Sequence, residues 1–130
     1  MLRIAATIGL KTYYFASEDV DYDNTFWEAR ISNQFEIERF FDISESTGNR
    51  IRSIQITLDN RDNFFRDIEK NDSLLNSKFV LYFNDGDDKV KTFTGIVNKI
   101  DSFGDDVSLT LMERGYEYLK NNFPDAQIAV

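Results

Sequence analysis

An early acidic segment has aspartates at the spacing of the first ligands of a calcium-binding loop: Asp19, Asp21 and Asp23. Such a loop next needs a glycine for a sharp turn and a closing glutamate that supplies two oxygens. The sequence has Asn24 and Arg30 at those places, and a cation cannot close a calcium site. We therefore interpret residues 17–24 as a solvated acidic loop and expect no metal site, with calcium as the alternative.

A second acidic group surrounds Gly86 and consists of Asp85, Asp87 and Asp88. An Asp-Gly pair tolerates the positive φ angles that a tight hairpin turn needs. We interpret this segment as a hairpin turn as well, and calcium is again the alternative.

The chain contains no histidine and no cysteine, which restricts the catalytic mechanisms open to it. Ser-His-Asp and Cys-His arrangements, thiolate zinc sites and disulfides are therefore excluded. No glycine-rich phosphate loop is present. A carboxylate pair can hydrolyse glycosides, but no spacing selects two of the 23 acidic residues. We expect no enzyme activity, no catalytic residues and no cofactor, and keep an acid-pair hydrolase as a residual alternative.

Aromatic residues are numerous and offer possible stacking platforms for a carbohydrate: Tyr13, Tyr14, Tyr22, Trp27 and Tyr82. Aromatic side chains in strands more commonly pack in a core or on a sheet face. Trp27 lies in the middle of an expected strand, and we expect it to anchor the core.

The elements that would position these residues are mostly strands, since apolar and polar residues alternate with the period of a half-buried strand. This pattern predicts strands over residues 2–8, 11–15, 26–32, 35–41, 53–58, 90–100 and 107–112. The uniformly apolar run 79–83 predicts a strand buried on both faces. Gly95 indicates a bulge or a close approach of two backbones.

Helical signals are short. Asn60 is a candidate N-cap, and Phe64, Phe65 and Ile68 would pack one or two helical turns on the sheet. A further short helix is predicted over 114–121, ahead of Pro124. Turns are predicted at 44–49, 84–86 and 103–105. The sequence thus predicts a single mainly β domain over residues 1–130, a barrel or sandwich with one or two short helices.

Net charge limits the partners. The chain carries 15 basic and 23 acidic residues, a formal charge of −8. Such a field repels a phosphate backbone, so we expect no specific nucleic-acid partner. No stretch approaches the roughly 20 apolar residues that a membrane-spanning helix needs, so we expect no membrane insertion.

A series of segments in fixed order carries a resemblance to a known family. They are Tyr13-Tyr14-Phe15-Ala16-Ser17-Glu18-Asp19, residues 31–41, Ser46-Thr47-Gly48, residues 53–65, residues 78–83, Phe93-Thr94-Gly95-Ile96-Val97 and residues 107–112. Together they resemble the N-terminal region of phage tail hub and baseplate proteins, including those of prophages and phage-derived injection machines. The resemblance covers about residues 12–119.

The resemblance implies a tail-tube-like β-barrel or sandwich with a helix, arranged in rings at the tip of a tail. It implies a structural role in which the chain self-associates as a trimer or ring and contacts other tail proteins. The expected location is the virion tail, reached from the bacterial cytoplasm during assembly. Family members are usually longer, so residues 1–130 would be either a short member of the family or the N-terminal part of a longer hub protein.

Two loops, 17–24 and 43–49, are candidates for contacts with neighbouring subunits. Free strand edges are also candidates, because unpaired N–H and C=O groups can pair with another chain. A β-sandwich binding module for carbohydrate or a peptide remains the alternative function.

Overall fold

The computed structural model describes residues 2–47, 53–84 and 90–113. Within these residues, eight strands form one sheet, and two helices accompany it. The strands are β1 (Leu2–Ile8), β2 (Lys11–Ala16), β3 (Val20–Tyr22), β4 (Thr25–Ala29), β5 (Ser53–Asp59), β6 (Lys78–Asn84), β7 (Val90–Phe103) and β8 (Asp106–Glu113). The helices are α1 (Gln34–Thr47) and α2 (Phe64–Asn71). The mainly β class predicted from the sequence is confirmed.

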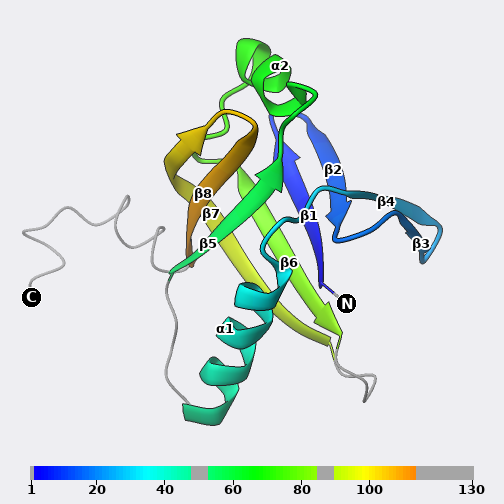
Figure 1. Ribbon diagram of the computed structural model, residues 1–130, viewed down its shortest axis with the longest axis vertical. Coiled ribbons are helices and arrows are strands. Elements are labelled where there is room, and N and C mark those ends of the chain that lie inside the picture. Colours follow the sequence, from blue (N-terminus) through cyan, green and yellow to red (C-terminus); the bar gives the residue numbers. More distant parts are fainter. Residues whose placement is uncertain (1, 48–52, 85–89, 114–130) are drawn as a thin grey trace, which may run out of the picture.

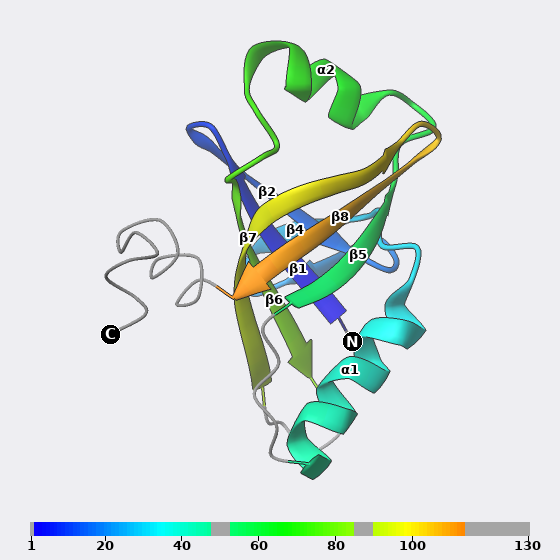
Figure 2. The ribbon, with the colours of Figure 1, turned by 90° about the vertical axis from the view of Figure 1, so that its left-hand side faces the viewer.

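The sheet curls back on itself. Its strand order is β3-β4-β2-β1-β6-β7-β8-β5, and every pair is antiparallel except β2 with β4. Strands β7, β8 and β5 cross in front of β1 and β6, which gives the outline of a half-barrel (Figure 2). Helix α2 lies over one end of this half-barrel, α1 lies at the other end, and the β3–β4 hairpin projects to the side (Figure 1).

Alternating side chains fill the concave side of the sheet. In the β5–β8 pair, Ile56 lies opposite Leu109 and Leu58 opposite Val107, and all four side chains are fully buried. Neighbours along these strands point to the other face, as the two-residue period requires. The other large side chains of the core include Leu2, Ile4, Ile8, Phe15, Ile37, Phe65, Leu74, Phe79 and Leu81.

Two glycines matter for the backbone. Gly9 adopts φ +63° in the turn between β1 and β2, a conformation that other residues rarely take. Gly95 allows two strands to approach, because a Cβ there would lie 2.9 Å from the Leu111 Cβ and 2.7 Å from the Phe93 ring. The close-approach alternative for Gly95 is therefore correct. The register irregularities of β7 lie further on, between Val97 and Lys99 and between Ile100 and Ser102.

Helix α2 packs on the sheet through the aromatic and aliphatic residues expected of it. Phe65 is fully buried, and Phe64 and Ile68 are half-buried against the core. The predicted cap was wrong, since the N-cap residue is Asn63 with φ 62° and no side-chain hydrogen bond. The Asn60 carboxamide oxygen instead accepts a hydrogen bond from the Phe65 N–H at 2.8 Å.

The predicted strand over residues 35–41 was wrong, because these residues form the first half of α1. Ile37 and Phe41 are buried four residues apart, the spacing of one helix face. Phe35, which a strand would have placed on the same face as Ile37, is exposed. The Gln34 carboxamide donates to Glu38 at 2.7 Å, a further contact at helical spacing.

Other expectations also need correction. The loop predicted at 17–24 contains β3, and the loop and turn predicted over 43–49 are helical as far as Thr47. Strand β6 is fully buried on one face only, since Val80 and Tyr82 are half-buried. The turn at 84–86, apart from Asn84 at the end of β6, and the helix predicted at 114–121 lie outside the described residues. Neither α1 nor α2 is long and apolar enough to span a membrane.

Candidate interaction surface

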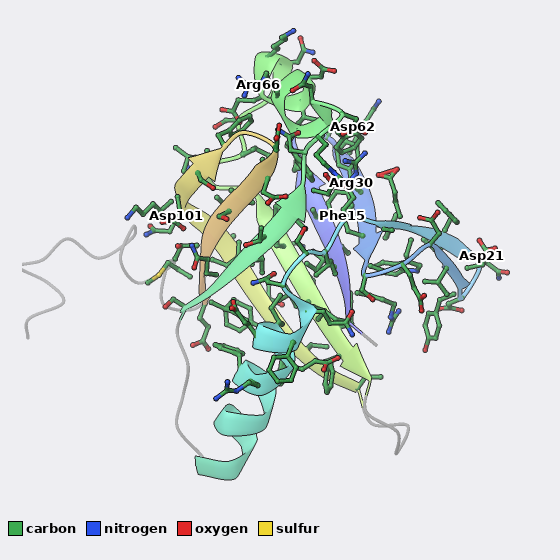
Figure 3. All side chains as sticks on the ribbon, in the orientation of Figure 1. Phe15, Asp21, Arg30, Asp62, Arg66 and Asp101 are labelled. Carbon is green, nitrogen blue, oxygen red and sulfur yellow. The ribbon has the colours of Figure 1, made fainter. Side chains whose placement is uncertain are left out.

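The aspartates with the spacing of a calcium-binding loop, Asp19, Asp21 and Asp23, lie at the base, strand and turn of the β3–β4 hairpin. Asp23 and Asn24 both have positive φ angles, 53° and 61°, and form the two-residue turn. The Asp19 carboxylate accepts a hydrogen bond from the Ala29 N–H at 2.9 Å and so ties the start of the hairpin to its end. Asp21 lies on β3 opposite Phe26 (Figure 3).

This geometry explains the aspartate spacing without a metal. The Asp19 carboxylate closes the base of the hairpin, Asp23 is a turn residue with a positive φ angle, and Asp21 lies on the strand between them. Across the part of the chain that the structure describes, no three acidic side chains gather as metal ligands. The acidic residues Asp85, Asp87 and Asp88 lie outside that part.

Four of the five aromatic residues singled out in the sequence meet on the outer, convex face of the sheet. They surround one arginine and form what we call the outer-face cluster: Arg3, Tyr14, Tyr22, Trp27 and Tyr82. Because Leu2 and Ile4 enter the core, Arg3 points outward from β1. Its guanidinium carbon lies 3.9 Å from the ring centroid of Tyr22 and 5.0 Å from that of Trp27.

The cluster has a buried floor and an exposed rim. Arg3 and Trp27 are each only 5% exposed, whereas Tyr14 and Tyr22 are 37% and 39% exposed. The Arg3 Nε is buried and has no hydrogen-bond partner. The rings of Tyr22, Trp27 and Tyr82 lie close to the guanidinium, and cation–π contact is strongest where the cation is shielded from water.

Trp27 is buried as expected, but it does not join the main core. It packs edge-on against Tyr14, with ring centroids 4.9 Å apart, and against Tyr82 at 6.3 Å. Tyr13 belongs to the opposite face, where its ring packs 5.6 Å from that of Phe64. Adjacent residues of a strand point to opposite faces, so Tyr13 and Tyr14 could never share one platform.

The two ends of the sheet differ. At the β5 end, the chain itself covers the strand edge, because the Asp59 N–H donates to the Arg30 carbonyl at 2.7 Å and the Ser32 N–H donates to Thr57 at 2.9 Å. The Asn33 side chain bonds the β5 backbone in the same way as a neighbouring strand would. It accepts from the Thr57 N–H at 2.9 Å and donates to the Gln55 carbonyl at 3.2 Å. Residues 30–33 therefore occupy this edge from Gln55 to Asp59.

The β3 end is open within the described residues. In a hairpin with a two-residue turn, the residues next to the turn pair with the opposite strand. Tyr22 is that residue here, so the N–H and C=O groups of Asp21 point away from β4. No strand lies beyond β3 in the sheet order of the described residues. The exposed side chains of Tyr22 and Phe26 flank this free edge.

A buried arginine joins β4, β5 and α2. Arg30 is 8% exposed, and its two terminal nitrogens donate to the two carboxylate oxygens of Asp62 at 3.0 and 2.8 Å (Figure 3). It also donates to the Asp59 carbonyl at 2.9 Å and, through Nε, to the Glu28 carboxylate. The guanidinium lies 4.1 Å from the Phe64 ring centroid. Such bidentate geometry is specific to arginine.

Charge pairing shifts the pKa values of this junction. Burial opposes the charge of Arg30, but the hydrogen bonds to Asp62 and Glu28 outweigh it and raise its pKa. The hydrogen bond from Arg30 is the main cause that lowers the pKa of Asp62 from 3.8 to about 2. A polar cleft of about 420 Å³ lies beside this junction, where the side-chain hydrogen bond from Arg61 lowers the pKa of Asp59. A general acid needs a raised pKa instead, so Asp59 acts as an ion-pair partner.

Replacing Asp62 with asparagine should flatten the acid dependence of stability. The folded pKa of about 2 lies below the unfolded value near 3.8, so the ionised carboxylate stabilises the fold above pH 4. That stabilisation is lost as the pH falls from about 4 to about 2. Melting temperatures measured from pH 7 to pH 2 should show Asp62→Asn below the unmodified chain at neutral pH and level with it near pH 2.

The matched control is Asp67→Asn, which removes an exposed carboxylate that pairs, among the described residues, with Lys70 alone at 3.6 Å. Exposed pairs contribute little, so its curve should follow that of the unmodified chain. If Asp62→Asn also followed that curve, the Arg30 pair would have no part in acid stability.

Sequence reasoning missed the residues that do most to build this surface. Arg30 was considered only as the residue at the closing position of a calcium loop, Asn60 was considered only as a helix cap, and Arg3 and Asn33 were assigned no role. An arginine within an alternating strand pattern was the available signal for Arg3. For Arg30 no local signal existed, because its partner Asp62 lies 32 residues away in the sequence.

Comparison with known proteins gives no family for this chain: no family model and no curated protein matches it.

Proposed function

We propose that the chain is a structural component of a phage-type tail or baseplate hub, which works by assembling with itself and with neighbouring tail proteins. The observation that carries this proposal is the difference between the two sheet ends. Residues 30–33 close the β5 edge, whereas β3 presents the outward backbone groups of Asp21 beside exposed aromatic side chains. Soluble proteins usually protect such edges, and pairing between subunits satisfies them.

The ordered series of segments that resembles tail hub proteins supports the same role. The curled sheet with accompanying helices agrees with the fold that this resemblance implies, although a fold alone does not determine a function. The acidic surface, with a net charge of −8, argues against assembly on nucleic acid.

The test is the mass of the purified chain in solution across a range of concentrations, by light scattering, with electron microscopy of the largest species. We expect trimers or rings at high concentration. Asp21→Pro removes the outward N–H of β3 without removing a bond to β4, and should lower the assembled fraction. Asp21→Asn keeps that N–H and serves as the control. A chain that stays monomeric at all concentrations would contradict self-assembly.

A second candidate function is carbohydrate binding, which the outer-face cluster favours. The partly exposed Tyr22 ring lies 3.9 Å from the buried Arg3 guanidinium, the partly exposed Tyr14 ring packs against Trp27, and rings of this kind can stack on sugars. Trp27 is the chain's single tryptophan, so its fluorescence reports on this cluster alone. Titration with an acidic oligosaccharide such as oligogalacturonate should change that fluorescence if the cluster binds sugars, and Tyr14→Ala should abolish the change. An unchanged spectrum would remove this candidate.

A further inference from the structure

A groove separates the β1–β2 hairpin from helix α2 and has a volume of about 490 Å³. We call it the β2–α2 groove; its lining residues are Leu10, Lys11, Tyr13, Phe64, Asp67, Ile68, Asn71 and Asp72. We propose that this groove binds an extended basic and apolar segment of a partner protein, which adds as a strand to the free edge of β2. The inference rests on the proposed role in assembly only for the identity of that partner.

The edge of β2 is free over the half of the strand that borders the groove. Strand β4 pairs with β2 only at Phe15 and Ala16. Ile8 and Lys11 pair across the two-residue turn, so the hydrogen bonds to β1 come from Lys11, Tyr13 and Phe15. The residue between the first two, Thr12, therefore directs its N–H and C=O away from β1. No described strand reaches Thr12 from that side.

The lining of the groove suits a strand whose alternate side chains point inward. Tyr13 and Phe64 pack edge-on with centroids 5.6 Å apart and, with the half-buried Ile68, form an apolar floor. Leu10 is fully exposed at the tip of the hairpin beside this floor and extends the apolar lining. An open strand edge facing a helix across an apolar floor is the arrangement in which β-augmentation gains both backbone bonds and side-chain pockets.

Charge determines which peptide fits best. Two carboxylates, Asp67 and Asp72, lie in the groove with one ammonium group, that of Lys11, and Asp67 also pairs with the Lys70 ammonium at 3.6 Å. Asp72 lies directly over the hairpin, since a Cβ on Gly9 would be 2.5 Å from its carboxylate oxygen. The chain as a whole is also acidic, at −8. A segment that alternates apolar and basic residues is complementary to this groove, whereas an acidic segment is not.

The probe is a short capped peptide in which valine and lysine alternate, titrated into the full chain by calorimetry. Amide hydrogen exchange by NMR should show the Thr12 N–H becoming slower to exchange when the peptide is bound. A peptide with glutamate in place of lysine should bind about tenfold more weakly or worse. A peptide with alternate backbone amides methylated should lose binding, because it cannot complete the ladder.

Two variants localise the site. Thr12→Pro removes the outward N–H and should weaken binding by about tenfold or more, whereas Thr12→Val keeps that N–H and should bind as the unmodified chain does. Circular dichroism checks that both remain folded. Asp67→Lys, an exposed change, should weaken the lysine peptide and strengthen the glutamate peptide, and it tests the groove even if Thr12→Pro does not fold.

Several results would overturn the inference. They are no binding at millimolar peptide, binding without slower exchange at Thr12, or equal binding of the lysine and glutamate peptides. Slower exchange at Thr12 that appears with rising protein concentration and no peptide would assign the groove to a second copy of the chain. A chain that assembles but binds no peptide would contradict this inference and leave the proposed function standing. A chain that binds the peptide but stays monomeric would contradict self-assembly and leave this inference standing.

Discussion

Replacing Trp27 with alanine is expected to lower the free energy of unfolding by about 3–5 kcal/mol, the usual cost of removing a large buried aromatic side chain. Trp27 is 95% buried and contacts Tyr14, Tyr82 and Arg3. Its loss would remove these contacts and expose the buried guanidinium on the convex face. Urea denaturation followed by circular dichroism measures the change without relying on tryptophan fluorescence.

The control variant is Trp27→Phe, which keeps an aromatic face over Arg3 and should lose clearly less stability. A double-mutant cycle with Arg3→Met isolates the cation–π contribution, which is about 2 kcal/mol where the cation is desolvated. If Trp27→Ala lost less than about 1 kcal/mol, the β3–β4 hairpin would not be held to the sheet by this cluster.

The strands of the half-barrel were predictable where one face is buried and the other is exposed to solvent. In β5, Ile54, Ile56 and Leu58 alternate with polar residues and are all buried. The period of two fixes the faces without any long-range information, because a shift of one residue would expose the whole apolar set. The same period assigns Tyr13 and Tyr14 to opposite faces of the sheet, but it does not predict which of the two faces the core.

Helix α1 was not predictable in this way, because its sequence fits two periods. Phe35 and Ile37 alternate with glutamates as a strand would, whereas Ile37 and Phe41 have helical spacing. The structure favours the second pattern, since Ile37 is buried and the Phe41 ring stacks 5.6 Å from that of Phe83 on β6. The contact between Phe41 and Phe83 joins residues far apart in the sequence, so a local sequence pattern cannot predict it.

The hairpin β3–β4 was missed for a chemical reason. Asp-Asn pairs tolerate positive φ, so Asp23 and Asn24 can form a tight turn as well as an acidic loop. The calcium template drew attention to side-chain oxygens, whereas Asp19 uses its carboxylate for the Ala29 N–H. The candidate surface likewise depends on pairings across the chain, such as Arg3 with Tyr22 and Arg30 with Asp62, that no spacing reveals.

Replacing Asn60 with alanine should cost about 2–4 kcal/mol, because the buried Phe65 N–H left without its acceptor costs about 1–3 kcal/mol and the hydrogen bond to the exposed residue Gly104 contributes about 0.5–1.5 kcal/mol. Asn60 is 1% exposed, and its side chain donates to the Gly104 carbonyl and accepts from the Phe65 N–H, each at 2.8 Å. Its own N–H donates to the Asp105 carbonyl at 2.8 Å. One side chain therefore joins the end of β5, the start of α2 and the β7–β8 turn.

The loss of stability in Asn60→Ala should be larger at the start of α2 than in the sheet. In Asn60→Ala, hydrogen exchange of the Phe65 amide should accelerate more than that of the β5–β8 ladder, because only the first loses its acceptor directly. Asn71→Ala, at the exposed end of the same helix, should change stability by no more than about 0.5 kcal/mol. If Asn60→Ala were equally mild and Phe65 stayed protected, water would have replaced both bonds, and α2 would depend on the burial of Phe65 alone.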